Sequence, residues 1–201
     1  MIRVLIAEDQ AMVRGALATL LELEGDIQVV AQVGRGDEAL LSAERLRPDV
    51  ALLDIEMPAL DGIETAQQLH RAQPDCVILM LTAFGRPGFL RRAMEAGASG
   101  FIVKDGPSEE LAATIRRAVA GERVIDPTLA AAALSAGPNP LTDRERDVLG
   151  AASDGSTIAA IATRLFLSEG TVRNYLSSAI QKTGARNRME AVRQAQTAGW
   201  L

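Results

Sequence analysis

The chain has 201 residues, 48% of them apolar, and a net charge of −5, which suits a globular protein of one large or two small domains. Its one cysteine, Cys76, excludes an intrachain disulfide and a metal site built from several cysteines. No N-terminal signal peptide is visible, and no stretch approaches the roughly 20 apolar residues that cross a bilayer. A soluble, cytoplasmic protein without membrane insertion is therefore expected.

The charge is unevenly distributed along the chain. Residues 1–140 carry a net charge of −7 and residues 141–201 a net charge of +2. An acidic front and a mildly basic back predict two domains with different partners.

Residues 1–121 alternate short apolar runs with helical patterns five times. The apolar runs, at residues 2–7, 29–33, 50–53, 77–81 and 101–103, have the length and composition of buried strands. The helical patterns cover residues 11–23, 39–46, 63–69, 89–96 and 111–119, with Ser108 as the expected N-cap of the last one. This alternation predicts an α/β domain with a doubly wound, five-stranded parallel sheet.

Polar side chains come at the ends of four of these predicted strands. They are Glu8 and Asp9 after the first, Asp54 at the third, Thr82 at the fourth and Lys104 at the fifth. The carboxyl ends of parallel strands share one edge, where open α/β sheets bind ligands, so these groups are expected to converge. Three converging carboxylates favour a hard cation such as Mg²⁺, for which the Glu56 carbonyl is a further candidate ligand.

This set of groups fits phosphoryl transfer onto a carboxylate. Asp54 is the candidate nucleophile, Mg²⁺ and Lys104 offset the phosphoryl charge, and the Thr82 hydroxyl is a donor. A phosphatase or hydrolase with an aspartate nucleophile is the alternative, but it usually needs a further acid or base and a substrate cap, and neither is evident. For any single acid, capping of a turn is the simpler explanation. Coincidence is a poor explanation for five polar groups at four strand ends.

The order of the motifs resembles the receiver domain of two-component response regulators. The motifs are Glu8-Asp9, Asp54 before Met57-Pro58, Asp61-Gly62, Thr82-Ala83, Gly97-Ala98 and Phe101-Ile102-Val103-Lys104, all within residues 1–121. The resemblance implies strand order 2-1-3-4-5 and phosphorylation of Asp54 by a sensor histidine kinase. It implies Mg²⁺ held by Glu8 or Asp9, Asp54 and the Glu56 carbonyl, and a switch pair of Thr82 and Phe101. Ala59 stands where glycine is common, a change that is harmless if its φ is negative.

The remainder of the chain reads as a linker and a second, all-α domain. Residues 122–140 contain three prolines and an alanine-rich piece that suits a short helix, and form the expected linker. Residues 141–201 predict four helices, at roughly 143–153, 157–165, 169–183 and 188–198. Thr142 and Glu145 form a capping box before the first, and Ser168 caps the third. The tight turn at Phe166-Leu167 is typical of a helix-turn-helix.

The third of these helices has a polar outer face that is expected to be free of acids. Its residues are Thr171, Arg173, Asn174, Ser177, Ser178 and Gln181. Arginine and asparagine read guanine and adenine edges in a major groove, and hydroxyls bind phosphates, so this face is predicted to contact DNA. Lys182, with Arg186 and Arg188, is expected to add contacts to the DNA backbone.

The second half resembles the LuxR/NarL DNA-binding domain. The matching residues are Leu141-Thr142-x-Arg144-Glu145, Ile161-Ala162, Leu165-x-Leu167-Ser168, Gly170-Thr171-Val172-Arg173-Asn174 and Asn187-Arg188. Ala160 replaces the usual glutamate and Tyr175 the frequent histidine, so the family's base preference does not transfer to this chain.

A narrower resemblance is to a regulator of lipid desaturation whose partner is a membrane thermosensor kinase. It is carried by Phe84-x-Arg86-Pro87-Gly88, Lys104-Asp105-x-Pro107-Ser108-Glu109-Glu110-Leu111 and Thr171-Val172-Arg173-Asn174-Tyr175. This resemblance implies membrane-lipid genes as targets.

The sequence as a whole predicts a two-domain response regulator and not an enzyme, with chemistry limited to phosphorylation and dephosphorylation of its own Asp54. Phosphorylation is expected to produce a homodimer that binds double-stranded promoter DNA and acts with RNA polymerase. The candidate dimer surface comprises Met12 and Leu23 of the first helix and Leu111 and Ile115 of the fifth. A regulator that binds DNA without phosphorylation is the alternative, which the intact acid set disfavours.

Overall fold

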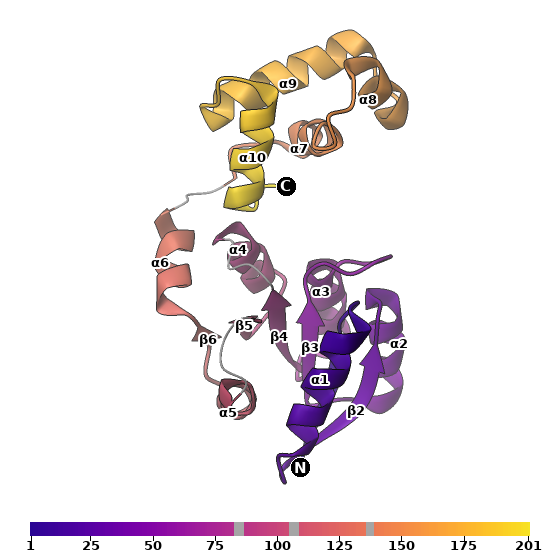
Figure 1. The fold of residues 1–201 in the computed structure, drawn as a ribbon, viewed down its shortest axis with the longest axis vertical. Coiled ribbons are helices and arrows are strands. Elements are labelled where there is room, and N and C mark those ends of the chain that lie inside the picture. The colour runs from indigo at the N-terminus through magenta and orange to yellow at the C-terminus, as the bar shows by residue number, and fades with distance from the viewer. Residues whose placement is uncertain (83–86, 105–108, 136–138) are drawn as a thin grey trace. The chain divides into compact units, whose positions relative to one another are not determined.

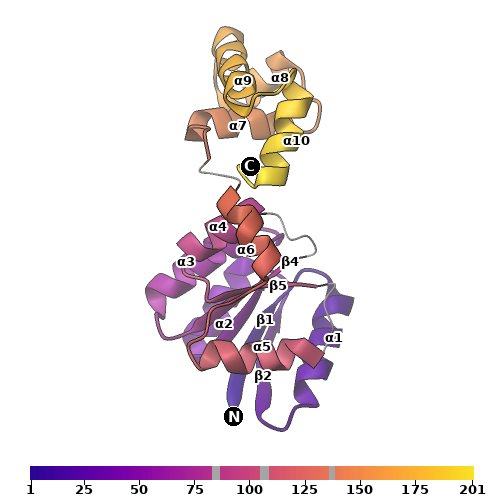
Figure 2. The ribbon, with the colours of Figure 1, turned by 90° about the vertical axis from the view of Figure 1, so that its left-hand side faces the viewer.

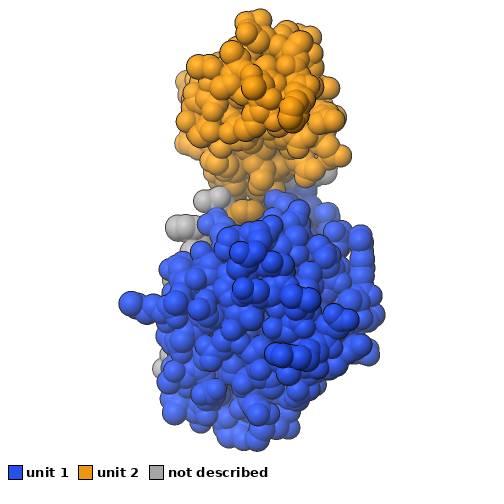
Figure 3. All heavy atoms as spheres, turned by 90° about the vertical axis from the view of Figure 1, so that its right-hand side faces the viewer, with its two compact units in different colours: residues 1–85, 90–130 blue, residues 86–89, 131–201 orange. Residues whose placement is uncertain are grey.

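The computed structural model describes residues 1–82, 87–104, 109–135 and 139–201. Phe84, Arg86 and the expected cap Ser108 lie outside the described residues. The chain divides into two compact units, one of residues 1–85 and 90–130 and one of residues 86–89 and 131–201 (Figure 3). Across the described residues, we find no helix of the length and apolarity that a membrane span requires.

The first unit is built on a parallel sheet in the order β2-β1-β3-β4-β5-β6 (Figure 1). The strands are β1 (Ile2–Ala7), β2 (Ile27–Val33), β3 (Val50–Asp54), β4 (Val77–Thr82), β5 (Gly100–Val103) and β6 (Val124–Ile125). The predicted order of the first five strands is confirmed. The sixth, β6, is a two-residue edge strand inside the stretch expected to be a linker, and it is too short to show a period of two in the sequence.

Helices cover both faces of this sheet. They are α1 (Ala11–Glu22), α2 (Gly36–Leu46), α3 (Gly62–Ala72), α4 (Pro87–Glu95) and α5 (Glu109–Val119); a further helix, α6 (Pro127–Ser135), follows β6 in the chain. The helices α1 and α5 lie on one face, and α2, α3 and α4 on the other (Figure 2). Every residue of β3 is buried, as expected for a central strand with helices on both sides, and this places Asp54 at the end of a rigid element.

The face under α1 and α5 holds one continuous apolar core. Alternate strand residues such as Val4, Ile6 and Leu52 point to this side and pack with helix residues, including Leu111 and Ile115. Leu111 is 7% exposed and Ile115 is fully buried, so the prediction that these two residues belong to an exposed dimer surface is wrong. The same helical spacing describes a core face and an interface, and only the packing decides between them.

The second unit contains the four predicted helices. They are α7 (Asp143–Ala151), α8 (Ile158–Leu165), α9 (Glu169–Thr183) and α10 (Arg188–Ala198). The predicted capping box at α7 is present, with Thr142 and Glu145 bonded reciprocally through their side chains and backbone N–H groups. The Ser168 side chain accepts a hydrogen bond from the Thr171 N–H, as predicted for the start of α9. The predicted all-α helix-turn-helix unit is confirmed.

Candidate functional site

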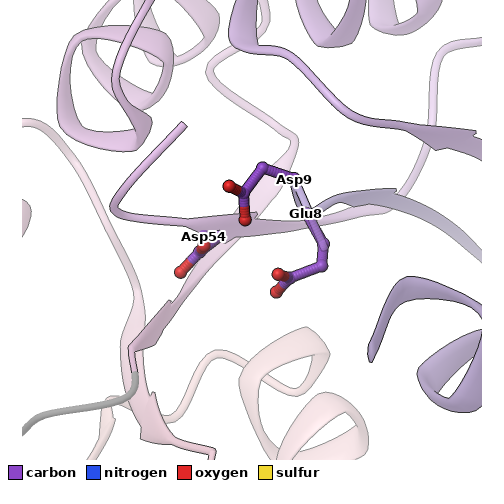
Figure 4. Close-up of side chains that lie close together, drawn as sticks. All are labelled: Glu8, Asp9 and Asp54. Carbon is purple, nitrogen blue, oxygen red and sulfur yellow. The ribbon is translucent and has the colours of Figure 1, made fainter. Parts of the chain in front are cut away.

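Three carboxylates converge at the carboxyl edge of the sheet. Glu8 and Asp9 follow β1, Asp54 ends the neighbouring β3, and the three side chains point into the same space (Figure 4). One oxygen from each residue lies within 4.8 Å of the others. Glu8 and Asp54 are buried, whereas Asp9 is exposed and leaves the cluster open to solvent.

Lys104 is the counter-ion of this cluster. Its Nζ lies 2.8 Å from Oδ1 of Asp54 and 2.6 Å from Oε2 of Glu8. Its backbone N–H donates to the Thr82 carbonyl at 2.8 Å, which fixes the end of β5 beside the end of β4. Burial raises the pKa of both Glu8 and Asp54 above its ordinary value. Burial alone would lower the pKa of Lys104, but its contacts with Asp54 and Glu8 raise it.

The donor set fits a hard divalent cation. Oε2 of Glu8 is buried and accepts no well-aligned hydrogen bond among the described residues, although Lys104 lies beside it. Asp9 gives the cluster an exposed oxygen, and Glu56 is exposed in the loop directly after Asp54. Mg²⁺ prefers oxygen ligands and keeps several waters, so a half-open carboxylate site of this kind suits it.

The loop after Asp54 is held close to the site. The Ile55 N–H donates to Oδ1 of Asp54 at 2.9 Å, and the Asp61 side chain caps α3. A Cβ on Gly62 would lie 1.9 Å from the Asp54 carbonyl oxygen, so only glycine allows the first turn of α3 to approach β3 this closely.

Ala59 in this loop departs from the expectation of a negative φ. Its φ is +68°, in the left-handed region that favours glycine. The condition under which alanine would replace glycine without cost is therefore not met. The loop keeps its course because Asp61 and Gly62 fix its far end against β3.

The residues predicted as the switch pair lie on neighbouring strands. Phe101 of β5 pairs in register with Met80 of β4, two residues before Thr82. Both Thr82 and Phe101 are buried, at 5% and 3% exposure. A pocket of about 730 Å³ between α1 and α5 is lined by Phe101, Lys104 and residues of both helices.

The helix α9 presents the predicted polar face. Arg173, Asn174 and Ser177 are exposed, and Thr171 is half-buried. The expectation that this face is free of acids is wrong, because Oε2 of Glu169 lies 2.7 Å from the Arg173 guanidinium, one turn away. Glu169 is the first residue of α9, and an acid is common there because it complements the helix dipole.

Ser178 and Lys182 contact a carboxylate of their own unit. The Ser178 hydroxyl lies 2.5 Å from Oε1 of Glu145, and the Lys182 Nζ lies 2.7 Å from Oε2. Burial raises the pKa of Glu145, but these two bonds and those from Thr142 outweigh burial and lower the pKa to about 2. Glu145 therefore joins α7 to α9 through Ser178 and Lys182, so any DNA contact that these two residues make has to compete with this carboxylate.

Two interactions at the sites were missed from the sequence. The Arg14 guanidinium donates to the Glu8 carbonyl at 2.5 Å, and Glu145 bonds to residues more than 30 positions away. The capping box explained Glu145 locally and gave no signal of the second role. Arg14 lies on α1, and the helical pattern of residues 11–23 gave no signal of this bond.

The structure therefore combines a doubly wound domain, which carries an acidic cluster at the carboxyl edge of its parallel sheet, with a helix-turn-helix unit. The family described as "Response regulator receiver domain" matches residues 4–116, and that described as "Bacterial regulatory proteins, luxR family" matches residues 139–195. The chain therefore belongs to the response regulators, with a receiver domain and a LuxR-type DNA-binding domain.

Relatives span the full length of the chain. An uncharacterized transcriptional regulatory protein, YvfU of Bacillus subtilis, is 46% identical over 201 residues, which is 100% of both chains. The transcriptional regulatory protein DesR of the same organism is 44% identical, again over 100% of both. The crystal structure of the response regulator ChrA, from a heme-sensing two-component system, aligns over 100% of this chain and 98% of its own, with a TM-score of 0.59 and 30% identity.

Proposed function

We propose that this response regulator is phosphorylated on Asp54 by a sensor histidine kinase, dimerises, and binds promoter DNA in the cytoplasm. The observation that carries the proposal is the position of Lys104, 2.8 Å from a buried Asp54 within a cluster of three carboxylates. A buried acid with a cationic partner at the open edge of a parallel sheet is suited to accept a charged group.

In the proposed reaction an oxygen of Asp54 attacks the phosphorus of the donor, and the bond from phosphorus to the donor's histidine nitrogen breaks. Glu8, Asp9, Asp54 and the Glu56 carbonyl would hold Mg²⁺, which when bound offsets charge on the phosphoryl oxygens. Lys104 pairs with the phosphorylated side chain, and Thr82 supplies a hydroxyl donor. Hydrolysis of the acyl phosphate returns Asp54 to its starting state.

Intact-mass measurement after treatment with acetyl phosphate and Mg²⁺ tests this chemistry. The wild-type chain is expected to gain one phosphoryl group, and neither Asp54→Ala nor a chelated wild-type sample should gain it. Asp49→Ala is a matched control, because Asp49 lies at the opposite end of β3 and should leave labelling intact. Full labelling of Asp54→Ala would disprove the assignment.

The DNA contacts are proposed for the outer face of α9, through Thr171, Arg173, Asn174 and Ser177. Arg173 and Asn174 are exposed and can reach base edges once the helix lies in a major groove. Each substitution by alanine is expected to cost about 1–3 kcal/mol of specific binding while the fold persists. Equal discrimination between selected and random DNA by both variants would place base reading elsewhere.

Dimerisation is proposed to use the surface of α1 beside α5. Met12 and Leu20 of α1, and Leu23 directly after it, are exposed apolar residues, and Val119 is exposed on α5. The pocket lined by Met12, Phe101 and Lys104 offers a route from the phosphorylation site to this surface. Two recognition helices on half-sites about one turn apart would raise affinity without new contacts.

Light scattering with and without beryllofluoride tests the dimer. A monomer that becomes a dimer on treatment supports it, and Met12→Asp should prevent the change. A chain that stays monomeric yet binds DNA more tightly after treatment would contradict it.

The alternatives and the targets are separable by experiment. Turnover of phosphate esters would indicate a phosphatase, and equal DNA binding by the wild type and Asp54→Ala would indicate a regulator independent of phosphorylation. Relatives of nearly equal identity carry different names, so similarity alone does not select membrane-lipid genes as targets. Genome-wide mapping of bound sites tests that prediction, and a reporter gene with added RNA polymerase distinguishes activation from repression.

A further inference from the structure

Phe166 is the most exposed large apolar residue among those described, with 96% of its surface open to solvent. It ends α8 in a left-handed conformation, at φ 55° and ψ 43°. The Leu167 N–H donates to the Ala162 carbonyl at 2.9 Å, and the Phe166 N–H donates to the Thr163 carbonyl at 3.4 Å. These two bonds close the helix in the way that usually requires glycine.

Two other left-handed helix ends among the described residues of this unit carry glycine. Gly184 ends α9 at φ 69°, and Gly199 ends α10 at φ 65°. A side chain with a Cβ is strained in this region of backbone conformation. Because the Phe166 ring is almost wholly exposed, the fold gains little burial in return. Neither packing nor backbone geometry within this unit accounts for phenylalanine at this position.

The position of Phe166 suggests what it contacts. It lies two residues before Ser168, the cap of α9, and the exposed residues 168–170 connect it to Arg173 and Asn174. In helix-turn-helix proteins the first residues of the recognition helix meet the base edges. Phe166 therefore precedes, by two residues, the cap of the helix proposed to enter the major groove.

We propose that Phe166 contacts DNA and packs its ring against the 5-methyl group of a thymine at the edge of each half-site. This inference rests on the proposed DNA-binding role of α9. The thymine methyl is the apolar group that base pairs present in the major groove, and phenylalanine is among the side chains that contact it. Phe166 thereby selects thymine at one position of the operator.

Replacement of thymine by uracil removes only that methyl group and gives a direct test. The full-length wild-type protein selects a binding site from a random DNA library, and each thymine of the site is then replaced by uracil. At one thymine per half-site, uracil is expected to weaken wild-type binding about three- to fivefold, as for the loss of one buried methyl group. Phe166→Ala should bind the unmodified site about tenfold more weakly and show no further loss at that uracil.

Phe166→Gly and Met189→Ala complete the test. Phe166→Gly relieves the backbone strain, so the melting temperature of this unit, followed by fluorescence of the single Trp200, should rise while DNA affinity falls. Met189 is also an exposed apolar residue of this unit, on α10, and Met189→Ala should leave DNA affinity unchanged.

Three outcomes would overturn the inference. Unchanged DNA affinity of Phe166→Ala would overturn the role of Phe166 and leave the proposed role of α9 intact. The same conclusion would follow if Phe166→Ala bound more weakly but no uracil substitution affected the wild type and the variant differently. Failure of the wild-type protein to select any sequence would overturn the proposed function of α9 and this inference with it.

Discussion

Nζ of Lys104 lies 2.8 Å from Oδ1 of Asp54 and 2.6 Å from Oε2 of Glu8, so one cation directly after β5 pairs with two buried acids, one directly after β1 and one at the end of β3. Without it, two carboxylates with raised pKa values would face each other at the end of the sheet. The stability of the receiver and the charge of its site therefore depend on the same side chain.

We predict that Lys104→Met makes the stability of the receiver depend on Mg²⁺. The variant should melt at a lower temperature than the wild type in the absence of the metal, because the acids lose their counter-ion. Saturating Mg²⁺ should raise its melting temperature by more than it raises that of the wild type, since only the folded state holds the site. Calorimetry of the full chain measures both values.

Lys182→Met, which removes a cation from the other unit, should show no enlarged response to Mg²⁺. An equal response of wild type and Lys104→Met would mean that the acid cluster does not bind the metal.

We predict that Ala59→Gly stabilises the receiver. Ala59 has φ +68°, where a Cβ costs about 1–2 kcal/mol, so glycine relieves this strain. The greater flexibility of glycine in the unfolded chain offsets part of the stabilisation. The net increase in the free energy of unfolding should be about 0.5–1 kcal/mol. Ala113→Gly, at an exposed position within α5, should have the opposite sign by a similar amount. Urea denaturation followed by circular dichroism compares the two, and destabilisation by Ala59→Gly would show that the conformation is not strained.

The alternation of apolar runs predicted the parallel sheet, and the residues that end each run predicted the convergence of Glu8, Asp9, Asp54 and Lys104, whereas the strand order came from the resemblance to receiver domains. Such rules concern neighbours in sequence and the shared edge of a parallel sheet. These rules do not predict the φ angle of Ala59, because that angle depends on the path of the loop to Gly62.

Burial on a helix face was the main point that the sequence left open. Met12 and Ile115 are both apolar residues on amphipathic helices, but one is 87% exposed and the other fully buried. Glu145 shows the same limit for polar residues. Its capping box is local and was predicted, whereas its bonds to Ser178 and Lys182 arise from the packing of α7 on α9.

We predict that Glu145 makes the stability of the DNA-binding unit depend on pH. Its pKa in the folded state is about 2, below the ordinary value of 4.5, so its contribution is fully present above about pH 4.5 and is lost as the pH falls toward 2. Glu145→Gln should lower the free energy of unfolding at neutral pH by about 2–3 kcal/mol and flatten this acid dependence. Fluorescence of Trp200 reports on this unit alone.

Asp154, whose pKa is also lowered to about 2, is a matched control on the surface of the same unit. Asp154→Asn should change the acid dependence less, because solvent screens exposed charges. An acid dependence of Glu145→Gln as steep as that of the wild type would show that the Glu145 network contributes little.

We predict that Glu169→Gln strengthens DNA binding. Glu169 pairs with Arg173 at 2.7 Å, and both side chains are more than half exposed, so the pair adds little to stability. In the free protein Glu169 occupies the Arg173 guanidinium, and this pair must break before Arg173 can contact DNA. In the complex the negative charge of Glu169 repels the DNA phosphates. The variant should bind its selected site about two- to tenfold more tightly at low salt, with a smaller gain at high salt. Glu22→Gln makes the same change of charge on α1 and should leave affinity unchanged. Fluorescence anisotropy over a salt series measures the DNA affinity of both variants. Equal affinities for wild type and Glu169→Gln would show that Glu169 does not limit DNA binding by Arg173.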